Sequence, residues 1–144
     1  MGRGQSSYND KPPFPQISEV DLNTIINGSP VLSAELTVKL GELVGKASKD
    51  VASAQIRTVF SNVRLIESDW SMNATSQEAD NAHRQLILLK SKLRYQVARK
   101  PELDNLVTLL NKAIDLVKNR DHFQRFVDFF EAILAYHKVA GGKN

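Results

Sequence analysis

Basic side chains are concentrated in one segment of this 144-residue chain. Residues 81–101 contain six of them and no Asp or Glu: Arg84, Lys90, Lys92, Arg94, Arg99 and Lys100. The rest of the chain has 13 Lys plus Arg against 16 Asp plus Glu, so the net charge of +3 divides into +6 here and −3 elsewhere. A localised positive cluster is the electrostatic pattern expected of a protein that binds a polyanion.

The same segment has the apolar period of an amphipathic helix. At about 100° per residue, one stripe contains Ala82, Leu86, Leu89, Leu93 and Val97. The other side carries Arg84, Lys90, Lys92, Arg94, Tyr95 and Arg99. Lys and Arg bind phosphates partly by releasing counterions, and Tyr95 is a candidate to stack on a base or ribose. The alternative is a solvated helix face, although such a face usually interleaves both signs of charge.

A second pair of cations, Arg57 and Arg64, is separated by seven residues, which is two helical turns. Both therefore share a helix face, with Ser61 between them. RNA contact explains this spacing, and so does an ion pair with Glu67 or with a partner helix; the spacing alone does not choose between them.

No constellation predicts catalysis or a metal site. The absence of cysteine excludes a disulfide, a thiolate zinc site and a cysteine nucleophile. Asp80 and His83 are three apart on a predicted helix, but no third ligand lies nearby in sequence. His137 falls on the apolar face of its helix, where we expect a core histidine. We therefore predict no enzyme activity, no metal, no cofactor and no small-molecule substrate.

The elements that position these residues are predicted to be helices. Residues 1–16, rich in Pro, Gly and Ser, predict a flexible arm, and residues 17–144 predict one compact all-α bundle of five to six helices. The expected helices cover about 17–26, about 30–44 with Leu32, Leu36, Leu40, Leu43 and Val44 inward, about 53–70 with Ser53 as its cap, about 76–98, about 103–117 and about 123–137. In the last helix, Phe129 and Tyr136 share a second strip, which indicates either a central helix or contact with a neighbouring protein. No apolar run reaches the ~18 residues of a membrane span, and the amino-terminal residues lack the apolar core of a signal peptide, so we expect a cytoplasmic protein.

Three segments, in this order, resemble the motifs of the small subunit of the type III-A CRISPR (Csm) effector complex. The first is Gln55-Ile56-Arg57 with Phe60, Val63 and Arg64; the second is Leu89-Lys90-Ser91-Lys92-Leu93-Arg94-Tyr95; the third is Phe126-Val127-Asp128-Phe129-Phe130-Glu131-Ala132-Ile133-Leu134-Ala135-Tyr136-His137-Lys138, followed by Gly141-Gly142-Lys143. In the second segment, Ser91 stands where the family usually has proline and Arg94 where it has a small residue. This departure predicts a straighter helix with one additional cation.

The resemblance implies a non-catalytic all-α subunit, present in several copies beside other Csm subunits. These copies would line the groove that holds the guide crRNA and its target RNA, and contact backbone while base pairing supplies the sequence. The predicted RNA-contacting residues are Arg57, Arg64, Arg84, Lys90, Lys92, Arg94, Tyr95 and Arg99, with Lys138 and Lys143 as weaker candidates. The alternative is a helical adaptor whose basic face binds an acidic protein partner. A regulatory nucleic-acid binder is a third hypothesis, although no clear helix-turn-helix pattern supports it.

Overall fold

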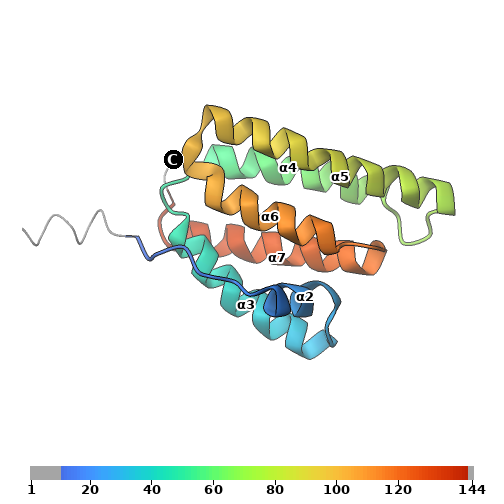
Figure 1. The fold of residues 1–144 in the computed structure, drawn as a ribbon, viewed down its shortest axis with the longest axis horizontal. Helices are drawn as coiled ribbons and strands as arrows, with labels where there is room; N and C mark the ends of the chain where they lie inside the picture. The colour runs from blue at the N-terminus through green and yellow to red at the C-terminus, as the bar shows by residue number, and fades with distance from the viewer. Residues whose placement is uncertain (1–10, 143–144) are drawn as a thin grey trace, which may run out of the picture.

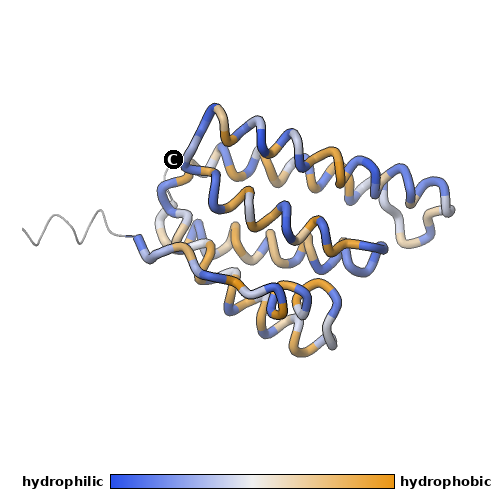
Figure 2. The backbone as a smooth tube through the Cα atoms, viewed as in Figure 1, coloured by the Kyte–Doolittle hydropathy of each residue, from blue (hydrophilic) through white to orange (hydrophobic). Residues whose placement is uncertain are grey.

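The computed structural model describes residues 11–142, which form six α-helices and one 3₁₀ helix (Figure 1). In chain order they are α2 (Glu19–Asn27), α3 (Pro30–Ala47), α4 (Ser53–Asp69), α5 (Ser76–Arg99), η1 (Pro101–Leu103), α6 (Asp104–Leu116) and α7 (Arg120–Val139). Residues 11–142 contain no strand. The prediction of an all-α bundle is confirmed, and Figure 2 shows hydrophobic and hydrophilic positions interspersed along the helices, as amphipathic helices require.

Local capping chemistry explains where most helices begin. Pro30 occupies the first turn of α3, where its missing N–H costs nothing. At the start of α5, the Thr75 hydroxyl accepts the N–H of Glu78, and the Glu78 carboxylate accepts the N–H of Thr75. The prediction that Ser53 caps α4 is wrong, because the cap is Ala52 and no side chain caps that helix.

Helix α7 is the centre of the bundle. It packs against α2, α3, α4 and α6, and its side chains Phe123, Phe126, Phe129 and Phe130 are all fully buried. Aromatic contacts extend this core outward: Phe60 of α4 meets Phe130 edge-on, with ring centroids 5.0 Å apart. The burial of Phe129 means that its strip belongs to the core of a central helix, while Tyr136 is half-buried.

The inward face of α3 differs from the prediction. Leu40 and Val44 are buried as expected, but Leu32 and Leu43 are 55% and 41% exposed. The buried side of α3 is instead made largely of small residues: Ser33, Thr37, Gly41, Gly45 and Ala47. A Cβ added at Gly41 would lie only 2.6 Å from the Cβ of Ala132 on α7. The predicted face was wrong because α7 approaches α3 too closely for leucine side chains to lie between them.

Helix α5 packs against α4 and α6 and contributes one apolar stripe to the core. Its buried residues are Ala82, Leu86, Leu89 and Leu93, as the periodicity predicts, and Val97 is partly buried beside them. One face of α5 is therefore fixed against the bundle, and the remaining surface is available for the charged side chains.

The predicted arm falls mostly outside the described residues, since 1–10 are not among them. Residues 11–18 form no helix, and Phe14 and Ile17 pack against the core. Lys11 forms an ion pair with Asp50 at 3.0 Å. Within the described residues, no helix is long and apolar enough to cross a membrane.

Candidate nucleic-acid interface

The flank of α5 that faces α6 holds two of the predicted RNA-contacting cations. The Lys90 ammonium is ion-paired with Asp115 of α6. The Arg94 guanidinium donates to Asp104 at 2.8 Å and to the Thr108 hydroxyl at 3.2 Å. Both cations thus have a carboxylate partner from the next helix along the chain.

The sequence analysis missed these partners because they are distant along the chain. Asp104 follows Arg94 by 10 residues and Asp115 follows Lys90 by 25. Residues 81–101 contain no acid, so the segment looks uncompensated until α6 packs beside it. The sequence did contain a signal for these ion pairs: the helix predicted next along the chain carries Asp104 and Asp115. Such acids have to be considered together with the cations of the helix before them.

The side of α5 that points away from the bundle carries a different set of residues, which we call the outer face of α5. It consists of Arg84, Leu88, Lys92, Tyr95 and Arg99, all of them exposed. Their spacing of four, four, three and four residues keeps them on one face of an α-helix. Tyr95 is 65% exposed and Leu88 is 45% exposed. Within residues 11–142, none of the three cations of this face forms an ion pair.

Arg57 and Arg64 lie on the flank of α4 that faces α7. Arg64 donates to Glu67 at 2.7 Å and to Glu131 of α7 at 2.8 Å, and its guanidinium lies 5.0 Å from the ring centroid of Phe60. The hydrogen bond to Glu67 is the main reason why the pKa of Arg64 is raised above its ordinary value. The ion pair weighed above is therefore present for Arg64.

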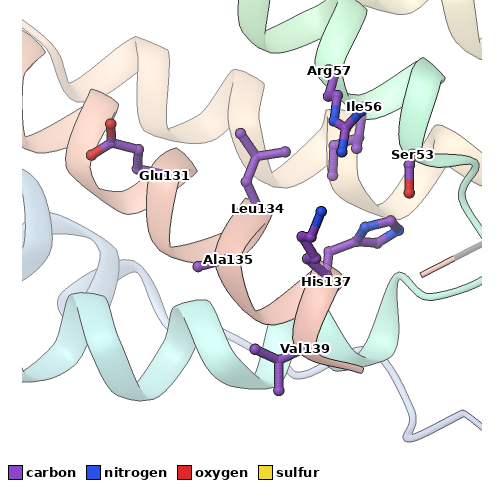
Figure 3. Close-up of a pocket in the computed structure, with 9 residues that line it drawn as sticks. Ser53, Ile56, Arg57, Glu131, Leu134, Ala135, His137 and Val139 are labelled. Carbon is purple, nitrogen blue, oxygen red and sulfur yellow. The ribbon is translucent and has the colours of Figure 1, made fainter. Parts of the chain in front are cut away.

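Arg57 is exposed and has no carboxylate partner among the described residues. It lines a groove of about 580 Å³ between α4 and α7, together with Ser53, Leu134 and Lys138. Figure 3 shows the Arg57 side chain extending from α4 toward this groove, with α7 on the other side. Arg57 is thus a cation without an ion pair among residues 11–142, beside a mainly apolar depression.

The eight predicted residues do not form one patch. They divide into the outer face of α5 with Arg84, Lys92, Tyr95 and Arg99, the α6 flank with Lys90 and Arg94, and the α7 flank of α4 with Arg57 and Arg64. Lys92 lines a groove with Asn62 and Leu65 on the other flank of α4. Helix α4 therefore separates the Arg57 group from the outer face of α5.

The three histidines are engaged in structural contacts. His83 stacks on Trp70, with ring centroids 5.5 Å apart. His122 accepts the N–H of Lys118 at its Nδ1 atom. His137 is 2% exposed, and its Nε2 donates to the carbonyl of Val51 at 2.8 Å, which confirms the prediction of a core histidine. No group of three or more metal-ligating side chains occurs in the part of the chain that the structure describes.

Comparison with known proteins gives one family. The family model described as "Csm2 Type III-A" matches residues 32–143 of the chain. A relative from Streptococcus thermophilus, named "CRISPR system Cms protein Csm2", is 27% identical over 113 residues, which cover 77% of this chain and 90% of the relative. No solved structure gives a significant match. The matched residues include α4, α5, α6 and α7, and therefore all three groups of cations.

Proposed function

Because the chain belongs to the Csm2 Type III-A family and is a small subunit of the type III-A Csm complex, we propose that it binds RNA backbone through the outer face of α5 and performs no catalysis. The observation that carries this proposal is the row of Arg84, Lys92 and Arg99, three exposed cations without an ion pair among residues 11–142. In the assembled complex, this face lines the groove that holds crRNA paired to target RNA, next to other Csm subunits and further copies of the chain.

The candidate residues are expected to contribute differently to RNA binding, depending on whether each cation already has a carboxylate partner. A free Lys or Arg that meets a phosphate releases counterions and gains that entropy. A cation that already has a carboxylate must give up this partner, and exposed pairs of this kind contribute about 0–1 kcal/mol. Arg84, Lys92 and Arg99 therefore supply most of the binding, and Lys90 and Arg94 supply less.

The dimensions of the outer face suit a polynucleotide. Arg84 and Arg99 are 15 residues apart, which corresponds to about 22 Å along a helix. That length spans several successive phosphates of one RNA strand. Tyr95, between Lys92 and Arg99, offers an exposed ring to a base or ribose. Contacts of this type fix the position of the RNA without reading its sequence.

The non-catalytic role is supported by the family and by the contacts of the histidines. His83 and His137 are occupied by aromatic stacking and by a backbone hydrogen bond. His137 is also buried, so it is not presented to solvent as a general base has to be. The subunit then acts as a scaffold and backbone clamp, and other subunits supply the chemistry.

The test compares two variants with matched design. The triple variant Arg84→Gln, Lys92→Gln, Arg99→Gln removes the three cations of the outer face of α5, whereas Lys90→Gln with Asp115→Asn removes an ion pair without changing net charge. Fluorescence anisotropy with several unrelated single-stranded RNAs measures the dissociation constant. We expect the triple variant to lose at least tenfold in affinity for every sequence and the control to stay within about threefold of the wild-type protein.

An equal loss in both variants would contradict the assignment to the outer face of α5. The adaptor hypothesis has its own outcome: wild-type protein that binds no RNA, alone or in the complex, but still co-purifies with the protein subunits. That result would replace RNA by an acidic protein partner as the ligand of this surface.

A further inference from the structure

A groove of about 230 Å³ lies between α4 and α5, immediately beside the outer face of α5. Four apolar side chains line it. Ile66 and Leu89 are buried, whereas Leu65 of α4 and Leu88 of α5 are 66% and 45% exposed. Two leucines this exposed on facing helices leave an apolar strip in contact with water. A groove of about 230 Å³ has room for one planar base.

The polar residues of the groove have the hydrogen-bonding capacity that base edges require. Asn62 of α4 and Gln85 of α5 are both among its lining residues. The Asn62 amide nitrogen makes one long hydrogen bond, 3.3 Å to the carbonyl of Thr58, and leaves its oxygen available as an acceptor. Gln85 makes no hydrogen bond within the described residues and retains both amide donors and its acceptor. Carboxamides are the side chains that pair well with base edges.

Among residues 11–142, the one charged residue that lines the groove is a cation, which favours an occupant attached to an anionic group. Lys92 is among its lining residues and belongs to the outer face of α5. No carboxylate is among the lining residues; the acid on this flank of α4, Asp69, comes four residues after Leu65 and lies outside the lining. An uncharged apolar side chain from a protein would leave both carboxamides and Lys92 without partners, whereas a nucleotide satisfies all three.

We infer that this groove holds one unpaired nucleobase of the bound RNA. Leu65 and Leu88 contact the face of the base, Asn62 and Gln85 meet its edge, and Lys92 meets the adjoining phosphate. The inference rests on the proposed function and deepens it, because it adds contact with an unpaired base to contact with backbone. A base within a duplex is stacked and paired, so only a nucleotide displaced from pairing enters the groove.

The test distinguishes the contribution of the bases to RNA binding from that of the phosphates. The full-length protein is titrated with two single-stranded RNAs of equal length and charge, one with normal uridines and one in which alternate nucleotides are abasic. We expect the wild-type protein to bind the uridine RNA about five- to tenfold more tightly. The variant Leu65→Ser with Leu88→Ser should lose most of this preference and bind the uridine RNA nearly as weakly as the abasic RNA. The matched control, Leu32→Ser with Leu43→Ser, changes two similarly exposed leucines of α3 and should keep the preference.

Several outcomes would overturn the inference. If wild-type protein binds both RNAs equally well, the groove holds no base, while the backbone proposal stands. If neither RNA binds, both proposals fail together. If Leu65→Ser with Leu88→Ser keeps the preference and Tyr95→Ala abolishes it, the base contact belongs to Tyr95. If the leucine variant retains its preference but loses association with other Csm subunits, the groove is a protein contact.

Discussion

The guanidinium of Arg94 in α5 donates to the carboxylate of Asp104, the first residue of α6, across 2.8 Å. The same carboxylate accepts the hydroxyl of Thr108 one turn later, at 3.3 Å. A negative charge at a helix N-terminus is also favoured by the dipole of that helix. Asp104 therefore stabilises the start of α6 and also pairs with a cation on the flank of α5 that faces α6.

The Arg94–Asp104 pair is expected to contribute little to stability. Its side chains are 48% and 62% exposed, and exposed pairs contribute about 0–1 kcal/mol. Replacing both residues, Arg94→Gln with Asp104→Asn, should change the free energy of unfolding by less than about 1 kcal/mol. Urea denaturation measures this change. A loss well above that range would mean that the pair holds α5 on α6, and not only that it balances charge.

The close packing of α3 on α7 predicts a reversal of the usual helix preference. Replacing an exposed helical glycine by alanine typically stabilises a protein by up to about 1 kcal/mol. At Gly45, however, the new Cβ would lie 2.7 Å from both the backbone nitrogen of His137 and the carbonyl oxygen of Ile133. We expect Gly45→Ala to lower the free energy of unfolding by about 1–3 kcal/mol, because backbone atoms cannot move aside as a side chain does.

The measurement for Gly45→Ala is the urea midpoint, with Lys39→Ala on the exposed side of α3 as the control. The control should be close to neutral. A Gly45→Ala protein that is as stable as the wild type, or more so, would show that α3 and α7 are not packed this closely.

The buried hydrogen bond of His137 predicts a second effect on stability. In His137→Leu, the carbonyl of Val51 loses its donor at 2.8 Å and stays buried. An unsatisfied buried acceptor costs about 1–3 kcal/mol, so the free energy of unfolding should fall by that amount. His137→Gln keeps an N–H donor and should recover part of the loss. Equal stability of His137→Leu and the wild-type protein in urea would show that this hydrogen bond does not matter.

Most of the fold follows from local sequence signals. Pro30 and Pro101 mark starts of elements, and the predicted range of 76–98 for the basic helix is one residue short of its observed end at Arg99. These signals act within a few residues, through caps and through apolar periodicity, so the sequence is sufficient to predict them.

The orientation of α3 could not be predicted in the same way. Its leucines at positions 32, 36, 40 and 43 form a convincing apolar stripe, yet Leu32 and Leu43 are exposed while Gly41 and Gly45 are buried. Which side of α3 faces inward depends on how closely α3 and α7 pack, and the sequence of α3 alone does not determine this distance. The available signal for close packing was the small residues at every fourth position, Ser33, Thr37, Gly41 and Gly45.

The sequence was sufficient to predict which residues lie in the candidate site, but not which of its cations form ion pairs. The segment 81–101 and the exposure of Tyr95 agree with the sequence pattern. The division between free cations and ion-paired cations depends on Asp104 and Asp115, which only the packing of α6 against α5 brings near. Leu88 was not singled out at all, because an exposed leucine has meaning only next to Leu65 of α4.

The salt dependence of RNA binding tests the central claim most directly. Each contact between a cation and single-stranded RNA contributes about 0.7 to the slope of log binding constant against log salt concentration. We predict that Arg84→Gln, Lys92→Gln, Arg99→Gln lowers the magnitude of this slope by about 2, which is three contacts at ~0.7 each. The charge-neutral control, Lys90→Gln with Asp115→Asn, should leave the slope within about 0.7 of the wild-type value. An unchanged slope in the triple variant would contradict the assignment of RNA binding to the outer face of α5.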